Sequence, residues 1–337
     1  MFKYYVHSNK NMENTNDVPG VVKISLLVIL CMQSSIYSIL GSYSGVYLKE
    51  MWSKSSMLMM AEIIKIVISL IMIIREYKYE SIRNIYISVK ESLPMVIPAI
   101  LFWVMNQLGL SSLDRLDATT FMACNQLKVL TTAGFSVVMM RKSIPYRKWR
   151  ALILLVLGII LVSNGKYVNM DKKQKQGEVI GILALLAQAI ISGFSTVYFE
   201  NVLKSGKFSL WERNLQLAIY SILFYIPKII YDDRSFFHGW TIHSVILCII
   251  SGYGGLLIAI TMKYTDSILK TFATSGAIIV TTILGYFFTN DPINIVISIG
   301  IICTILSLLN YIEGDCKCKQ EKYEYEYECV DSKEEDV

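Results

Sequence analysis

The sequence predicts an all-α polytopic membrane protein with ten transmembrane helices. Hydrophobic residues make up 54% of the 337 residues and charged residues only 18%, whereas a soluble domain carries about 25% charge. Apolar runs of roughly 18 residues or more, the length that spans a bilayer as a helix, recur along almost the whole chain. Two of these runs carry a lysine in a matching setting, which indicates an internal repeat.

The apolar runs are separated by short segments that hold most of the charge. Pro19, Pro145 and Pro292 stand at or near expected helix starts, where the missing N–H of proline costs no hydrogen bond. The ten helices are expected at 22–48, 52–74, 92–113, 117–140, 147–164, 178–204, 210–231, 240–263, 267–289 and 292–312.

The helices group into two sets of five, and polar segments flank the sets. The tail is rich in Glu, Lys and Tyr and is expected to be disordered. The expected parts are a leader at 1–20, a first repeat at 21–165, a linker at 166–177, a second repeat at 178–312 and the tail at 313–337.

The distribution of Lys and Arg sets the expected orientation, because basic residues concentrate on the cytosolic side. With a cytosolic N-terminus, the leader, the even-numbered connections and the tail hold most of these residues, including a cluster from Arg141 to Arg150. We therefore expect both termini in the cytosol and the 166–177 linker in the lumen. The leader lacks the pattern of a cleaved signal peptide.

Several polar residues fall inside expected helices of the first half. Glu62 and Lys65 lie three residues apart on one helix face. They are expected either to form an internal ion pair or to form a pair whose lysine binds a phosphate. Asn106 and Gln126 are amides in or beside apolar segments. An amide suits the edge of a nucleobase, although a hydrogen bond between helices is the simpler interpretation.

The second half has its own polar positions. Ser192 belongs to a run of small residues that lets a backbone or a ligand approach closely. Asn214 lies in Trp211-Glu-Arg-Asn-Leu-Gln216, an unusually polar start for a membrane helix. Asp266 precedes the ninth helix, where a carboxylate complements the helix dipole.

Lys128 and Lys270 are the residues around which the prediction of a site is built. A charged side chain deep in a bilayer costs roughly 2.5–3.5 kcal/mol on insertion scales. An internal partner, a water-filled cavity or an anionic ligand must offset this cost. One such lysine in each half favours a central site for an anion.

The two halves also resemble each other in sequence. Ser44-Gly-Val-Tyr-Leu-Lys49 is similar to Ser195-Thr-Val-Tyr-Phe-Glu200, and the Leu-Lys elements repeat in the same order. Because five is an odd number, the second set of helices enters the membrane in the opposite direction. Such an inverted repeat is typical of alternating-access transporters, which hold the substrate near the midplane.

Other functional classes fit the sequence less well. The net charge of +5 does not indicate nucleic acid, and the seven scattered cysteines predict neither a disulfide framework nor a metal site. An enzyme would need carboxylates or a metal in a soluble loop, but the longest linker is mainly Lys, Gln and Asn. A structural scaffold would not explain matching lysines in both halves. We expect no cofactor.

Six segments together resemble the nucleotide-sugar transporter family, in the subfamily for UDP-galactose, UDP-N-acetylglucosamine and CMP-sialic acid. The resemblance covers nearly all of residues 22–312. The segments are Gln126-Leu-Lys-Val-Leu-Thr-Thr132, Gly193-Phe-Ser-Thr-Val-Tyr-Phe-Glu-Asn-Val-Leu-Lys204, Trp211-Glu-Arg-Asn-Leu-Gln216, Lys263-Tyr-Thr-Asp-Ser-Ile-Leu-Lys270, Ala61-Glu-Ile-Ile-Lys65 and Leu116-Asp-Ala118.

The resemblance implies the ten-helix drug/metabolite transporter fold and exchange of a cytosolic nucleotide sugar for a lumenal nucleoside monophosphate. It also implies a Golgi membrane, with the endoplasmic reticulum as the alternative, and allows a homodimer in membrane lipid. Lys128 and Lys270 would contact the phosphates. The nucleoside would be contacted by Asn106, Ser192 and Asn214. Glu62 with Lys65 would line the sugar side of the site or a gate.

The sequence departs from the family around the nucleoside. Phe121, Met122 and Asn125 stand where the family usually has Tyr, Gln and Tyr. Phe121 can still stack on a base or ribose but lacks the hydroxyl. The run from Val129 to Ala133 resembles UDP-sugar members, which favours uridine. Exchange of CMP-sialic acid for CMP, or transport of another small metabolite by the same fold, is the alternative.

Overall fold

The computed structural model describes most of the expected membrane region. The leader, the linker at 166–177 and the tail lie almost wholly outside the described residues, as do Leu116-Asp-Ala118 and the cysteines of the tail. The described residues are 19–42, 44, 53–77, 89–113, 115, 121, 124–167, 178–205, 208–231, 236–289 and 294–311.

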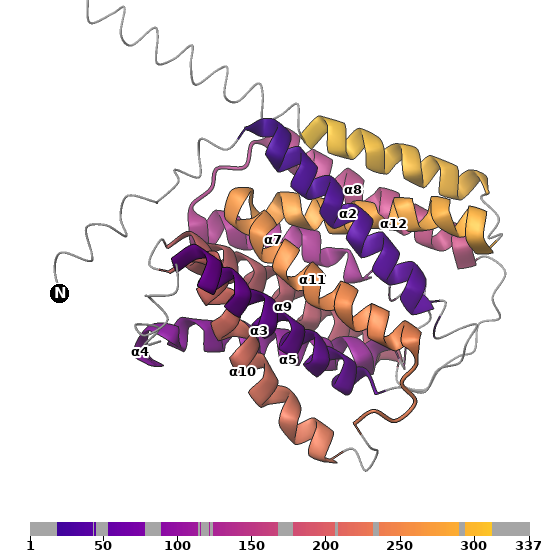
Figure 1. Ribbon diagram of the computed structural model, residues 1–337. Coiled ribbons are helices and arrows are strands. Elements are labelled where there is room, and N and C mark those ends of the chain that lie inside the picture. Colours follow the sequence, from indigo (N-terminus) through magenta and orange to yellow (C-terminus); the bar gives the residue numbers. More distant parts are fainter. Residues whose placement is uncertain are drawn as a thin grey trace, which may run out of the picture.

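Every regular element among the described residues is a helix, which confirms the all-α class (Figure 1). A last helix, Ile295–Tyr311, follows the labelled ones and is the yellow ribbon in Figure 1. The labelled helices are α2 (Gly20–Ser42), α3 (Lys54–Tyr77), α4 (Val89–Ser92), the 3-10 helix η4 (Leu93–Met95), α5 (Val96–Leu113), α7 (Leu127–Met140), α8 (Tyr146–Tyr167), α9 (Glu178–Lys204), α10 (Leu210–Tyr231), α11 (Ile242–Tyr264) and α12 (Ser267–Thr289).

These bounds agree with most of the expected ranges; the end of the helix expected at 22–48 lies outside the described residues, and two other helices are interrupted. The helix expected at 92–113 consists of α4, η4 and α5 in succession, because Pro94 stands at the start of the 3-10 turn. Within the range expected at 117–140, Phe121, Cys124 and Asn125 are helical, and α7 continues from Leu127 after a turn residue, Gln126. Residues 116–120, 122 and 123 lie outside the described part of the chain.

The protein is a polytopic membrane protein. Five of the described helices are long and apolar enough to cross a bilayer, and three shorter apolar helices, including α7 and Ile295–Tyr311, accompany them. Large apolar side chains cover the outer faces; on α2, for example, Ile24, Val28 and Met32 are exposed. Such side chains are stable in contact with lipid chains rather than water.

The bundle is held together mainly by contacts between helices that are distant in sequence. Helix α3 packs on α10 and α11, α9 packs on α5 and α7, and α2 packs on α11 and α12 (Figure 1). One buried cluster joins α7, α8 and α12, and a second joins α5, α9, α10 and α11. Helices α2 and α3 therefore meet their main packing partners only after α10, α11 and α12 have been synthesised.

Helix α8 and the last helix approach each other through two glycines. A Cβ added to Gly158 would lie 2.6 Å from Thr304 Oγ1, and one added to Gly300 would lie 2.7 Å from the backbone oxygen of Gly158. Small residues at such a crossing let two membrane helices pack backbone to backbone.

We expect Gly300→Ala to lower the stability of the protein in detergent by about 1–3 kcal/mol, because the added methyl group meets backbone atoms that cannot give way. Gly134→Ala in α7 is the matched control, since a Cβ there has no atom within 4 Å. Thermal unfolding of both purified variants tests this. Equal melting temperatures for the two would contradict the packing described.

Candidate functional site

Lys128 and Lys270 both lie in the first turn of a helix. Lys128 is the second residue of α7 and Lys270 the fourth of α12, and these two helices pack on each other. Helical residues also precede α7, since Phe121, Cys124 and Asn125 are helical and Gln126 is a turn residue with helical backbone angles. The positive end of the α12 dipole acts on Lys270, whereas Lys128 follows helical residues that precede α7.

Neither ammonium group has a partner in the described part of the chain. Both side chains are partly buried, and no described residue forms an ion pair or hydrogen bond with either Nζ atom. The two groups are also close enough for Lys128 to repel Lys270 electrostatically. The two cations and the start of α12 therefore place positive charge where α7 packs on α12.

Gln126 fixes the start of α7. Its side chain is almost fully buried, and its Oε1 accepts a hydrogen bond of 3.3 Å from Ser275 Oγ of α12. The backbone oxygen of Lys128 accepts bonds from Thr131 Oγ1 (3.1 Å) and Thr132 Oγ1 (2.7 Å). One hydrogen bond therefore joins the turn before α7 to α12, whereas the two threonine bonds lie within α7. Among the described residues the Nε2 group of Gln126 has no hydrogen-bond partner.

A second polar cluster lies among α3, α5 and α10. Asn106 Nδ2 donates to Tyr225 Oη at 2.9 Å, and Lys65 Nζ lies 2.6 Å from Glu62 Oε2. Tyr225 also feels the charge of Glu62, which places the two pairs near each other. The ion pair is mostly buried, since the side chains of Lys65 and Glu62 are 12% and 14% exposed.

Gly255 of α11 lies next to this ion pair. A Cβ at this position would come within 2.9 Å of Lys65 Cδ, so the glycine makes room for the lysine side chain. Four helices thus surround the pair. Its neutral overall charge contrasts with the unpaired lysines of α7 and α12.

The remaining predicted residues are less closely connected. Asn214 is buried in α10 and its Nδ2 donates to the backbone oxygen of Leu210 in its own helix at 3.0 Å. Ser192 and Phe121 are partly buried, and no contact to another predicted site residue joins them to either cluster. Among the described residues no three His, Cys, Asp or Glu side chains are grouped as metal ligands would be.

Two polar residues of these clusters were not predicted from the sequence. Tyr225 lies eleven residues after Asn214, three turns along the same helix face, so the 3.6-residue period contained a signal for it. Ser275 offered none, because serine is common in membrane helices and its partner Gln126 is 149 positions away.

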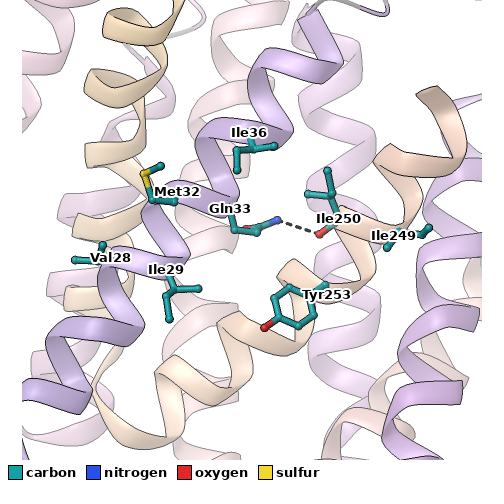
Figure 2. A pocket seen from close by; sticks show the side chains of 8 residues that line it. All are labelled: Val28, Ile29, Met32, Gln33, Ile36, Ile249, Ile250 and Tyr253. Carbon is teal, nitrogen blue, oxygen red and sulfur yellow. Dashed lines mark hydrogen bonds between the residues drawn. The ribbon is translucent and has the colours of Figure 1, made fainter. Parts of the chain in front are cut away.

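An apolar hollow on the outer face does not coincide with either cluster. It lies between α2 and α11 and is lined by Val28, Met32, Ile36, Ile249 and Tyr253 together with Ile29, Gln33 and Ile250 (Figure 2). Gln33 Nε2 donates to the backbone oxygen of Ile250 at 3.0 Å. Because none of the predicted site residues lines it, we assign this hollow to the lipid-facing surface.

Comparison with known sequences gives a match along nearly the whole membrane region. The family described as "Nucleotide-sugar transporter" matches residues 19–312. The UDP-N-acetylglucosamine/UDP-N-acetylgalactosamine transporter nstp-4 of Caenorhabditis elegans is 34% identical over 328 residues, which cover 90% of this chain and 96% of that protein. The human UDP-N-acetylglucosamine transporter is 32% identical over 290 residues, with 80% and 88% coverage.

Two further comparisons agree with these. The UDP-galactose/UDP-N-acetylglucosamine transporter srf-3 of Caenorhabditis elegans is 32% identical over 310 residues, covering 87% of this chain and 83% of that protein. A solved crystal structure superposes on this chain with a TM-score of 0.66 at 12% sequence identity. The superposition covers 86% of this chain and 97% of the chain in that structure. At that identity the likeness establishes a shared fold and nothing more.

We expect the paired Lys65 and the unpaired Lys128 to differ in how the removal of their charge changes the stability of the protein. Lys65→Met should destabilise the protein by about 3–5 kcal/mol, because it leaves Glu62 as a buried charge without a partner. Lys128→Met should leave stability unchanged or raise it, since it removes a cation that no described residue compensates.

Thermal unfolding in detergent without added ligand measures both effects. The double variant Glu62→Gln with Lys65→Met should recover most of the loss. An equal loss in Lys65→Met and Lys128→Met would contradict the distinction between paired and unpaired lysines.

Proposed function

This chain belongs to the nucleotide-sugar transporter family, and from that premise we propose that it exchanges a cytosolic UDP-sugar for lumenal UMP by alternating access. UDP-N-acetylglucosamine and UDP-galactose are the proposed sugars, since they are named for the relatives described above. The proposal is for a transporter in a Golgi or endoplasmic reticulum membrane with both termini in the cytosol. It includes no enzymatic step.

The unpaired cations Lys128 and Lys270 are the observation that carries the proposal. Two ammonium groups that repel each other are stabilised by an anion between them, and a ligand with about two negative charges would neutralise both. A nucleoside diphosphate sugar and a nucleoside monophosphate each supply about that charge. Exchange of one for the other is then nearly electroneutral and needs no ion gradient.

The helix start that carries Lys270 supports a phosphate ligand. The first-turn N–H groups of a helix and its dipole attract anions. In α7 the polar turn at Gln126 interrupts what would otherwise be a longer helix. Transporters with inverted repeats commonly use such interrupted helices to bind charged substrates near the midplane.

The pattern of helix contacts supports the inverted repeat of five plus five helices. If α2, α3, α5 and α7 correspond to α9, α10, α11 and α12, the α7–α9 contact corresponds to α12–α2. By the same exchange, α5–α9 corresponds to α11–α2 and α5–α10 to α11–α3. All six contacts are present, and α3–α10 and α7–α12 each map onto themselves.

Two glutamine–glycine contacts are also related to each other when the helices of the two proposed halves are interchanged. Gln33 of α2 lies against Gly254 of α11, where a Cβ would be 2.2 Å from its Nε2. Gln188 of α9 lies against Gly109 of α5, where the same distance would be 3.0 Å. In each case the first helix of one half packs on the third helix of the other through an amide and a glycine.

The other predicted residues have roles in this scheme. Asn106 and Gln126 each retain part of their amide for a nucleoside, because among the described residues Asn106 bonds only through its Nδ2 group and Gln126 only through its Oε1 atom. Ser192, Asn214 and Phe121 complete the proposed nucleoside contacts. Glu62 and Lys65 line the sugar side, where this ion pair of zero net charge forms hydrogen bonds with the hydroxyl groups of the sugar.

Exchange in proteoliposomes tests the function. Vesicles preloaded with UMP, CMP or no nucleotide are offered labelled UDP-N-acetylglucosamine, UDP-galactose and CMP-sialic acid. We expect uptake of a UDP-sugar that requires internal UMP. Dependence on internal CMP would instead establish the sialic-acid branch. Equal uptake with and without internal nucleotide would contradict antiport.

Lys128→Ala and Lys270→Ala should each abolish exchange and leave the melting temperature in detergent nearly unchanged, because both lysines serve an external anion. Lys263→Ala, at the end of the neighbouring helix α11, is the matched control and should exchange normally. Normal transport by either Lys128→Ala or Lys270→Ala would show that the phosphate assignment is wrong.

Phe121→Tyr should preserve or increase the affinity for UMP, because it adds a hydroxyl to a side chain proposed to stack on the nucleoside. Competition by unlabelled UMP in the exchange assay gives the affinity. A loss of folded protein in this variant would show that Phe121 packs in the bundle rather than against the ligand.

A further inference from the structure

Glu200 is a fully buried carboxylate near the end of α9 that none of the proposed roles uses. Its Oε1 atom accepts hydrogen bonds from Lys204 Nζ at 2.7 Å and from Lys142 Nζ at 2.9 Å. Its Oε2 atom accepts one from the backbone N–H of Ser267 at 2.8 Å. A buried carboxylate is stable only when such partners compensate its charge.

Two of these three contacts join elements of the second half. Ser267 is the first residue of α12, three positions before Lys270, so this bond holds the helix start that carries the proposed phosphate ligand. Lys204 belongs to α9 itself, and its Nζ also donates to the backbone oxygen of Thr265 at 2.6 Å. Together they fix the connection between α11 and α12 against α9.

The third contact joins the two halves. Lys142 follows α7, the helix of Lys128, and its Nζ also lies 3.9 Å from Asp266 Oδ2. Arg141 adopts a left-handed conformation with φ 52° and its N–H bonds to the backbone oxygen of Ser136. This reversal ends α7 and directs the chain so that Lys142 reaches Glu200 rather than continuing along the helix.

We propose that Glu200 is a positioning residue for transport: it holds the start of α12, and Lys270 with it, throughout the cycle, and it releases Lys142 when the two halves separate. The inference rests on the proposed function and on the orientation that places this end of the bundle in the cytosol. Entry of a cytosolic substrate between α7 and α12 then requires the Lys142 contact to break. The contacts to Lys204 and Ser267 do not cross between halves and stay intact.

The two lysines form a natural matched pair for a test. They contact the same oxygen atom at similar distances, and their side chains are 29% and 26% exposed, so the removal of either costs Glu200 one cation. They differ in which elements they join. A merely structural role for the cluster would make the Lys142→Gln and Lys204→Gln variants behave alike.

The experiment measures UMP–UMP exchange by the full chain in proteoliposomes with the cytosolic face outward. Lys142→Gln favours the state open to the cytosol, so the KM for external UMP should fall about three- to tenfold while the maximal rate falls as well. Lys204→Gln should not lower the KM, because it loosens the start of α12 that carries Lys270 and leaves the contact between the halves in place, and Lys142→Arg should keep the wild-type KM. An unchanged KM in Lys142→Gln, or the same shift in both Gln variants, would overturn the proposal.

Hydrogen exchange of the same variants tests the second part without transport. The amides at the start of α12 should remain protected in Lys142→Gln and lose protection in Lys204→Gln. Loss of protection in Lys142→Gln would refute the division of roles. Absence of UMP exchange by the folded wild-type protein would instead refute the proposed function, and the hydrogen-exchange result would still decide the structural part.

Discussion

The desolvation of charge inside a bilayer is the constraint on which this structure depends. Glu62 with Lys65, and Glu200 with its three donors, satisfy it by internal pairing, so these groups are stable without any ligand. Lys128 and Lys270 do not satisfy it within the described part of the chain. In the proposed function a bound anion supplies this missing compensation, which is what a carrier of phosphorylated substrates requires.

Most of the fold was predictable from the sequence because lipid leaves a chain few alternatives. Backbone groups in the bilayer must be bonded within their own segment, so each apolar run becomes a helix wherever it is long enough. The predicted starts near Pro145 and the predicted ends at Lys204 and Thr289 agree with the structure. The turn at Gln126 was not predictable from the apolar pattern, nor was its hydrogen bond to Ser275 in a distant helix.

The candidate site was predictable in its charges and less so in its contacts. Isolated lysines in apolar segments are visible in any linear sequence, and Lys128 and Lys270 indeed lie on neighbouring helices. The partners of the amides were not visible, since Tyr225 looks like one aromatic residue among many. Glu200 was also missed as a functional position, because an acidic residue four before Lys204 near a helix end resembles an exposed ion pair on a surface.

The hollow between α2 and α11 has a consequence for the surrounding membrane (Figure 2). It lies where α2 meets α11, two helices that the proposed repeat assigns to different halves. In the proposed cycle, rocking of one half against the other widens or narrows this seam and changes the area that lipid must fill. Part of the work of that cycle would then be done against the elasticity of the bilayer, so that acyl-chain length and lateral tension would enter the turnover rate alongside the chemistry of the substrate.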